Sequence, residues 1–258
     1  MHYASLASGS KGNCHALSHE GRTLLIDVGI SFLQIRMRLQ ALNWRLDQVR
    51  GIAITHEHSD HIRAIPMILK RTDWAILATP GTIGVAESGG IKIPEGRMVP
   101  LRAGNSTNWD GWTIKPFSVS HDAIDPIAYR IEVPDCNLAV ITDLGYVSAL
   151  VVDYCKGLDI LVIESNHDIE MLREGPYDPW LKARIFGRTG HLSNDACAEL
   201  LKKAVSPKLK HIVLAHLSEQ NNEPVLARLA SQSALSQNGS DASLHVATQK
   251  TPLEICLA

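Results

Sequence analysis

The most constraining feature of the sequence is the heptapeptide 55–61 (THEHSDH), which holds three histidines and two carboxylates. The four residues before it are apolar and partly β-branched, which predicts a short buried strand that ends at the heptapeptide. On the turn that follows, His56 and His58 can point to one side. Asp60 and His61 then point to another, which is the arrangement that two adjacent metal ions need. A solvated polar loop with ordinary histidines is the alternative, but four donors at this spacing favour metal.

The pattern His-x-His-x-Asp-His after a strand resembles the signature of the metallo-β-lactamase superfamily, and residues at other predicted strand ends match further motifs of it. The resemblance implies that Asp27 orients the metal loop through hydrogen bonds, that His121 completes a three-histidine site and that His216 is the last ligand. It also implies that Asp143 bridges two metals, as in the phosphodiesterase-like branches. The true β-lactamases lack this bridging residue, which argues against lactam hydrolysis.

One assignment uses all of these candidate ligands. It gives the first metal His56, His58 and His121, the second metal Asp60, His61 and His216, and makes Asp143 the bridge. Two cations about 3.5–4 Å apart lower the pKa of a shared water and clamp the attacking and leaving oxygens. We therefore expect hydroxide attack on a phosphorus or carbonyl centre. Histidine donors suit zinc, while a bridging carboxylate also accepts manganese or iron.

A further histidine, His191, stands just ahead of a predicted helix, whose N-terminus favours anions. We expect it to bind the scissile phosphate or to protonate the leaving oxygen, as a neighbouring non-ligand histidine does in related phosphodiesterases. Asp60 is expected to take part in catalysis as well as in metal binding.

Local patterns predict the elements that carry these residues. The predicted strands cover residues 3–7, 23–29, 51–54, 74–78, 112–119, 128–133, 138–142, 160–164, 211–216 and 244–247. The predicted helices cover residues 31–42, 62–70 and 195–205, with a short one after the Pro80-Gly81 turn. The tail, with a polar loop at 236–243, is expected to be peripheral.

Strand-end donors spread along the chain can converge only if two sheets present the same edge. The resemblance supplies such a fold, an α/β protein built as an αββα four-layer sandwich. We expect residues 1–258 to form one domain with two α/β halves, about 1–145 and 146–258.

Composition narrows the function classes. A formal net charge of −2 argues against a broad cationic surface, so any nucleic-acid contact must come from a local patch. Five scattered cysteines without a C-x-x-C pair are expected to be buried free thiols in a reducing compartment. The chain has no apolar run of about 18 residues and no signal-peptide pattern, so we expect a cytoplasmic protein without a membrane span.

Two stretches suggest substrate contacts. The segment 171–188 interleaves arginine and lysine with aromatic residues, which is typical of single-strand or phosphate binding, although an ordinary amphipathic helix looks similar. The glycine-rich stretch 8–13 is either an anion-binding turn or a plain hairpin turn. The candidate substrate contacts are Ser8, Ser10, Asn13, Asn166, His167, Arg184, Arg188 and Ser193. A loop histidine such as His167 can equally have no chemical role.

A closer resemblance is carried by six stretches, which are 6–13, 55–61, 119–122, 164–168, 190–194 and 214–218. Together they are similar to the YycJ (WalJ) family of bacterial metallo-β-lactamase-fold proteins. This resemblance implies a DNA exonuclease that acts 5′ to 3′. The departures are small, since Val28 stands where alanine is more usual and Cys14 follows the asparagine. The chain is too short for an inserted β-CASP domain.

Three other functions remain open from the sequence alone. The same centre suits a phosphodiesterase for a small nucleotide or cyclic phosphate, or a glyoxalase II-like thioester hydrolase, which also has a bridging aspartate. A non-catalytic binding module would leave the ligand set without a purpose. The expected partner is a DNA end or a small phosphodiester. The oligomeric state stays open, with a homodimer as one option.

Overall fold

Strands of three to seven residues, most of them rich in apolar residues, are arranged in two seven-stranded sheets in the computed structural model, which describes residues 1–257. The first sheet has the order β14-β1-β2-β3-β4-β5-β6 and the second β13-β12-β11-β10-β9-β8-β7. The strands of the first sheet are β1 (His2–Ala7), β2 (Cys14–His19), β3 (Arg22–Ile26), β4 (Val49–Ala53), β5 (Ala75–Ala78), β6 (Met98–Pro100) and β14 (Leu253–Cys256). Those of the second are β7 (Thr107–Trp109), β8 (Trp112–Ser118), β9 (Ile127–Val133), β10 (Cys136–Ile141), β11 (Ile160–Glu164), β12 (His211–Ala215) and β13 (Ser243–Val246).

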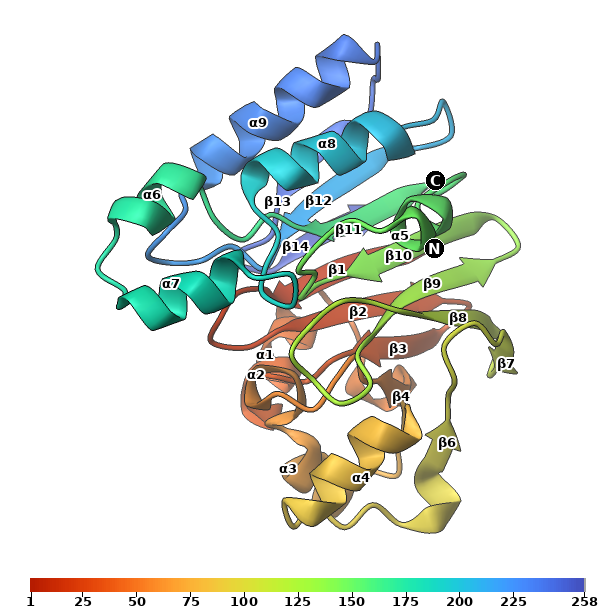
Figure 1. The fold of residues 1–258 in the computed structure, drawn as a ribbon. Coiled ribbons are helices and arrows are strands. Elements are labelled where there is room, and N and C mark those ends of the chain that lie inside the picture. Colours follow the sequence, from red (N-terminus) through yellow and green to blue (C-terminus); the bar gives the residue numbers. More distant parts are fainter. Residues whose placement is uncertain (258) are drawn as a thin grey trace.

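Helices cover the outer face of each sheet (Figure 1). On the first sheet these are α1 (Phe32–Ala41), α2 (Ser59–Ile62), α3 (Ile65–Arg71) and α4 (Pro80–Ser88), with short 3-10 turns at Leu46–Gln48 and Glu95–Arg97. On the second they are α5 (Ala149–Tyr154), α8 (Asn194–Ala204) and α9 (Pro224–Gln237), while α6 (Ile169–Glu174) and α7 (Pro179–Phe186) lie beside the ends of the strands. In the described part of the chain, no helix has both the length and the apolar character that crossing a bilayer requires.

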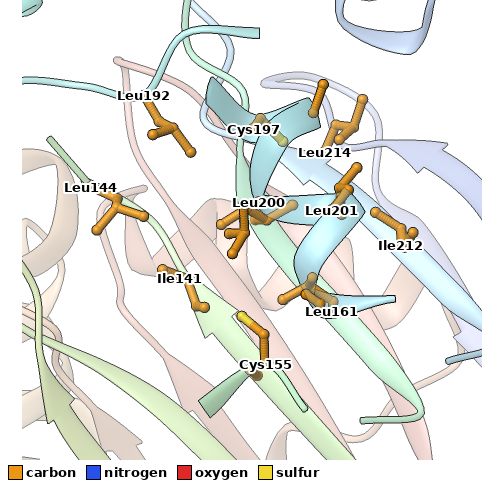
Figure 2. Packing of buried hydrophobic residues seen from close by; sticks show 14 of the residues in the cluster. Ile141, Leu144, Cys155, Leu161, Leu192, Cys197, Leu200, Leu201, Ile212 and Leu214 are labelled. Carbon is orange, nitrogen blue, oxygen red and sulfur yellow. The ribbon is translucent and has the colours of Figure 1, made fainter. Parts of the chain in front are cut away.

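Three hydrophobic layers result from the alternation of side chains along the strands. Val140 lies in the layer between the two sheets, while its neighbour Ile141 lies in the layer under the helices. Figure 2 shows this outer layer, where Leu161 of β11 packs with Leu200 and Leu201 of α8. A third layer joins the first sheet to α1, α3 and α4. The prediction of an αββα sandwich is confirmed.

Helix caps explain why several helices begin where the sequence predicts. The Ser31 side chain accepts a hydrogen bond from the backbone of Gln34 and starts α1. Ser193 does the same for α8, and Pro66 lies in the first turn of α3, where its missing N–H costs nothing. The segment 171–188 differs from a single helix, because Gly175 separates α6 from α7 and Asp178 caps the second one.

The expectation of a peripheral tail is wrong. Strand β14 pairs antiparallel with β1, with His2 opposite Cys256. Ahead of it, the Gln249 side chain donates a hydrogen bond to the backbone oxygen of Gly12 (2.9 Å) and accepts one from the backbone of Lys11 (3.0 Å). The tail therefore completes the first sheet and holds the loop at 8–13. Four residues of mixed polarity carry too little periodicity to reveal such a strand.

The cysteines follow the expectation with one exception. Cys14, Cys136, Cys155 and Cys197 are buried free thiols. Cys256 is exposed, because it lies near the end of the edge strand β14, and for this residue the expectation is wrong.

Candidate metal centre

The carboxyl ends of six strands meet at one edge of the sandwich, and a polar residue or loop stands at each. Strands β10, β11 and β12 are mutually parallel, as are β3 and β4, so their carboxyl ends share an edge. The residues at these ends are Asp27 after β3, the loop 55–61 after β4, His121 after β8, Asp143 after β10, Glu164 at the end of β11 and His216 after β12.

The backbone turns sharply at three of these ends. Asp27, Asp143 and His216 have φ values of 58°, 57° and 54°, in the left-handed backbone region that residues other than glycine seldom adopt. Such conformations cost about 1–3 kcal/mol each and persist where the surroundings enforce them. Here the enforcement comes from buried hydrogen bonds, and the result is that Asp143 and His216 face one another while Asp27 faces the loop 55–61.

Two of these turns share the pattern Asp-x-Gly. A Cβ atom on Gly29 would lie 1.5 Å from the backbone oxygen of Asp60, and one on Gly145 would lie 2.1 Å from that of Arg188. Only glycine allows either approach. Gly29 therefore lets the turn after β3 pack directly against the loop 55–61.

The predicted ligands divide into groups whose donor atoms lie within 4.8 Å of one another. His56, His58 and His121 form one such group, and Asp60, His61 and His216 form another.

Asp143 lies between these two groups. Its Oδ1 is 3.7 Å from Nε2 of His121 and 3.7 Å from Nε2 of His216, and its Oδ2 is 3.1 Å from Nε2 of His61. The structure thus brings together the seven residues that the sequence predicts as ligands.

Unpaired polar atoms at the centre of the cluster fit a bound metal. Among residues 1–257, Asp143 Oδ2 and His216 Nε2 are buried and have no hydrogen-bond partner of suitable geometry. A buried polar atom without a partner costs free energy, so its persistence calls for a ligand. Imidazole nitrogens and carboxylate oxygens are the donors that divalent transition metals prefer.

The charges of the cluster are interdependent. Burial opposes protonation of His61, but Asp143 and Asp27 outweigh it and raise its pKa well above the usual value. Burial likewise opposes protonation of His216, yet Asp143, Asp60 and Glu164 raise its pKa to about 10. Burial favours a neutral Asp143, but His216 and His61 hold the pKa of its carboxyl well below the usual range. The carboxylates thus stabilise positive charge at the position where a metal ion would supply it.

Asp27 orients the loop 55–61 from behind. Its carboxylate accepts hydrogen bonds from the backbone N–H of Thr55 (2.8 Å), from the Thr55 hydroxyl (2.9 Å) and from Nδ1 of His61 (2.8 Å). With Nδ1 engaged, Nε2 of His61 faces the cluster. Partners of this kind fix the tautomer and direction of a metal-binding histidine.

Glu164 has a comparable position that the sequence analysis did not assign. It is fully buried, and its carboxylate binds Nδ1 of His191 (2.8 Å) and Nδ1 of His216 (3.0 Å). It also accepts the backbone N–H groups of Leu144 (2.7 Å) and Leu192 (3.2 Å). Burial would raise the pKa of Glu164, but the two histidines lower it to about 2. The signal was present, since Glu164 ends an apolar strand just as Asp27 follows one.

His191 lies at the rim of the cluster. Its ring stacks 5.2 Å from that of His216 and lies 5.3 Å from that of His121. Burial disfavours its charged form, but Glu164 and Asp143 prevail and raise its pKa. Because Nδ1 binds Glu164, Nε2 is the nitrogen that remains to serve a substrate.

Several predicted substrate contacts bind protein groups instead. The Ser8 hydroxyl accepts the backbone N–H of His216 (2.7 Å), and the Asn166 side chain donates to the backbone oxygen of His216 (2.8 Å). Asn13 Nδ2 lies 3.2 Å from Nε2 of His61. These three side chains hold metal-ligand candidates in place.

Four backbone amides of the loop at 8–13 are bonded within the protein. The N–H groups of Gly9, Lys11, Gly12 and Asn13 bind Asn13 Oδ1, Gln249 Oε1, the Gly9 oxygen and the Asp60 oxygen. Because the loop also links the antiparallel strands β1 and β2, these bonds favour the hairpin turn over the anion-binding turn. Ser10 is exposed on this loop.

The remaining candidates surround the cluster. Arg184 Nε donates to Asp122 Oδ2 (2.6 Å), and Asp122 Oδ1 in turn lies 3.3 Å from Nε2 of His121. The guanidinium of Arg188 lies 4.1 Å from the centre of the Tyr146 ring. These two arginines form a cationic rim beside the metal-ligand candidates.

Comparison with known proteins places these features in context. Residues 22–217 match the family model described as beta-lactamase superfamily domain. Over 240 residues the chain is 36% identical to exodeoxyribonuclease YycJ of Bacillus anthracis, covering 93% of this chain and 90% of that protein. It is 35% identical over 237 residues to exodeoxyribonuclease WalJ of Streptococcus pneumoniae, covering 91% and 88%. The structure of zinc-bound PqqB from Methylobacterium extorquens superposes with a TM-score of 0.74 at 18% identity over 100% of both chains, a likeness of fold.

Proposed function

The chain belongs to the YycJ/WalJ family of the metallo-β-lactamase superfamily, and on that basis we propose that it is a metal-dependent phosphodiesterase that degrades DNA from the 5′ end. The support from relatives is broad, because the similarity to the two exodeoxyribonucleases spans about nine tenths of each protein. The observation that carries the proposal is Asp143, whose carboxylate lies between two groups of metal donors next to a histidine held by a buried glutamate.

We propose that two divalent ions occupy the cluster. One would be held by His56, His58 and His121, the other by Asp60, His61 and His216, with Asp143 between them. Zinc or manganese fits this donor set, and iron is a further candidate. When bound, such ions lower the pKa of a water molecule and offset the negative charge of a phosphodiester.

The protein groups supply orientation and a proton. Glu164 accepts the hydrogen bond from Nδ1 of His191, which directs Nε2 toward the site. Although burial opposes it, the pKa of His191 is raised by Glu164 and Asp143, which favours the protonated form of its ring. In our proposal a water oxygen bonds to phosphorus and loses a proton to the solvent, while the Nε2 proton of His191 passes to the leaving oxygen as its P–O bond breaks. Asp60 contributes to catalysis by setting the charge and position of the second donor group.

The remaining residues take two roles in this proposal. Ser8, Asn13, Asn166 and Asp27 position the ligands through the hydrogen bonds described above. The candidates for direct substrate contact are Ser10, His167, Arg184, Arg188 and Ser193. Because both sheets supply donors to one cluster, we also propose that residues 1–258 act as one domain rather than two separable ones.

The test is degradation of end-labelled linear DNA, single-stranded and duplex, with added Mn²⁺ or Zn²⁺. We expect digestion from the 5′ end by the wild type, and its loss in Asp143→Ala and His191→Ala. His245→Ala is a matched control, because its imidazole pairs with His211 away from the cluster. Intact DNA together with cleavage of a chromogenic phosphodiester would replace the exonuclease by a small-substrate phosphodiesterase. Cleavage of a thioester alone would point to a glyoxalase II-like enzyme.

A further inference from the structure

A cavity of about 390 Å³ opens beside the metal-ligand candidates. Its wall is formed by the turn after β10, residues that follow β11, the end of α7 and one side of α8 as far as Lys203. The residues used below are Tyr146, His167, Phe186, His191, Glu199 and Lys203, all of which line it. His191 belongs to both spaces, because its ring also stacks on His216 of the donor cluster. A ligand in the cavity is therefore next to whatever occupies the cluster.

Two aromatic side chains stand open at this cavity. Tyr146 is 37% exposed and Phe186 is 46% exposed, although large apolar rings are usually buried. Both are held in place, since Phe186 packs at right angles to His167 at a ring distance of 5.4 Å and Tyr146 lies under the guanidinium of Arg188. Fixed, exposed rings of this kind are the surfaces on which single-stranded bases stack.

A polar group on the wall lacks a partner. His167 is 2% exposed, and within the described residues its Nδ1 has no hydrogen-bond partner. Burial lowers the pKa of His167 to about 4, so the ring is neutral at pH 7 and offers one donor and one acceptor nitrogen. A small concave space lined by aromatic rings and a neutral imidazole has the character of a small-molecule pocket.

The chemistry of the lining selects among occupants. Apart from His191, which lies at the border with the donor cluster, Glu199 and Lys203 are the charged residues that line the cavity. These two are opposite in sign, so the part of the cavity away from the cluster has no net charge that would favour a phosphate. The volume suits one small planar group. A protein partner would instead need a broad surface, which a cavity of this size does not offer.

We propose that this cavity, which we call the base pocket, binds the nucleobase of the terminal nucleotide while its phosphodiester lies at the donor cluster. The proposal rests on the proposed exonuclease function and adds a substrate requirement to it. The base must leave the stack of its neighbours in order to enter. An end base is stacked on one side only, whereas an internal base is stacked on both. The base pocket would thus favour strand ends without reading sequence.

The kinetic test compares two oligonucleotides that differ only in the 5′ residue, which carries a normal base or is abasic. For the wild type we expect kcat/KM to be about 10-fold or more lower with the abasic end, since stacking contributes about 1–3 kcal/mol per base. Phe186→Ala should lower kcat/KM for the normal end about 10-fold and leave the abasic end unchanged. Phe186→Leu, which keeps apolar packing but removes the ring, should behave like Phe186→Ala. Trp180→Ala is the matched control, because Trp180 is 72% exposed on the same helix and does not line the cavity.

A binding measurement separates this proposal from the exonuclease itself. An oligonucleotide with 2-aminopurine at its 5′ end should change its fluorescence on binding metal-free wild-type protein, and less so with Phe186→Ala. Equal kcat/KM for the two ends, or equal losses on both in Phe186→Ala, would overturn the base pocket while leaving the exonuclease intact. If DNA is not degraded, the exonuclease fails, and an unchanged 2-aminopurine signal would then overturn the base pocket as well.

Discussion

Glu164 acts at the scale of single residues, because one buried carboxylate orients two histidines with different tasks. It binds Nδ1 of His216, a metal-ligand candidate, and Nδ1 of His191, the proton-donor candidate. Removing its charge without changing its shape should therefore disturb metal binding and proton transfer together.

We expect Glu164→Gln to lower kcat about 10- to 100-fold, the range typical of partners that orient metal-binding histidines. The metal content should fall as well, whereas the circular dichroism spectrum should stay unchanged. Steady-state kinetics and metal analysis of the purified protein test this. Glu132→Gln is the control, because Glu132 pairs with Lys115 and Arg130 on the surface. Wild-type kcat in Glu164→Gln would contradict the role assigned to this residue.

His15 makes stability depend on pH. Burial, with smaller contributions from His61 and His216, lowers its pKa from 6.5 to about 3. The folded protein keeps His15 neutral, whereas the unfolded chain protonates it below about pH 6.5. His15 therefore leaves the free energy of unfolding unchanged above pH 6.5. As the pH falls from 6.5 toward 3, His15 lowers the free energy of unfolding by about 1.4 kcal/mol per pH unit.

At pH 5 this amounts to about 2 kcal/mol relative to pH 7. In His15→Gln, which can still pair with the Tyr3 hydroxyl, the drop in the free energy of unfolding between pH 7 and pH 5 should be smaller by about 2 kcal/mol. Urea unfolding at pH 5, 6 and 7, with chelator present in every sample, measures the difference. Parallel pH dependence in the two proteins would show that His15 contributes nothing.

The strand-end residues were predictable from the sequence because each follows an apolar run, and an apolar run is a local signal. Asp27, Asp143 and His216 all satisfy this rule. Glu164 satisfies it as well but was taken as part of its strand, so its function went unassigned. The hydrogen bonds of Ser8 and Asn166 could not be predicted, since their partner His216 lies far away in the sequence.

At the scale of elements, the contact between two turns depends on the absence of a side chain. Gly29 follows β3 and packs on the backbone of the loop 55–61. A methyl group there would force the loop away from Asp27 and spread the donors.

We expect Gly29→Ala to lower the free energy of unfolding by about 3 kcal/mol or more, since added volume in a closely packed region forces backbone shifts. The variant should also lose bound metal. Gly84→Ala is the matched control, because no atom lies within 4 Å of its Cβ position in α4, and alanine there should be neutral or stabilise by up to about 1 kcal/mol. Denaturant unfolding and metal analysis of both variants make the comparison. Equal stability of the two variants would contradict the packing argument.

Prediction of the elements succeeded where caps and periodicity agree. The predicted helices 31–42 and 195–205 begin within a residue of α1 and α8, and most of the interior strands were visible as apolar runs. Strands β2, β6, β7 and β14 and helices α5 and α9 were missed, and β14 is short and of mixed polarity. The segment 171–188 covers parts of two helices, α6 and α7, which are separated at Gly175. The alternation of basic and aromatic residues continues across this glycine, so it did not reveal the boundary.

At the scale of the whole molecule, the donor cluster connects two sheets that otherwise meet through apolar packing. The loop 55–61 comes from the first sheet, while His121, Asp143 and His216 come from the second. Metal bound there would cross-link the sandwich at one edge. No local window of sequence contains this convergence, and it was anticipated only through the resemblance to a known fold.

We expect removal of metal by a chelator to lower the Tm of the wild-type protein by roughly 5–10 °C. A ligand at 100 times its Kd stabilises by about 2.7 kcal/mol, and each kcal/mol shifts the Tm by about 2–4 °C at this size. Thermal unfolding followed by circular dichroism, with and without chelator, measures the shift. Asp143→Ala should respond little to the chelator. A Tm that is unaffected in the wild type would show that bound metal does not hold the two sheets together.

Strand β14 has a consequence for how the protein is made. Strand β1 is synthesised long before its outer neighbour, residues 253–256. Until those residues have left the ribosome, one side of β1 has no hydrogen-bond partner and is open to pairing with another chain. Nascent chains that stall between β13 and β14 would therefore be especially exposed to misassembly.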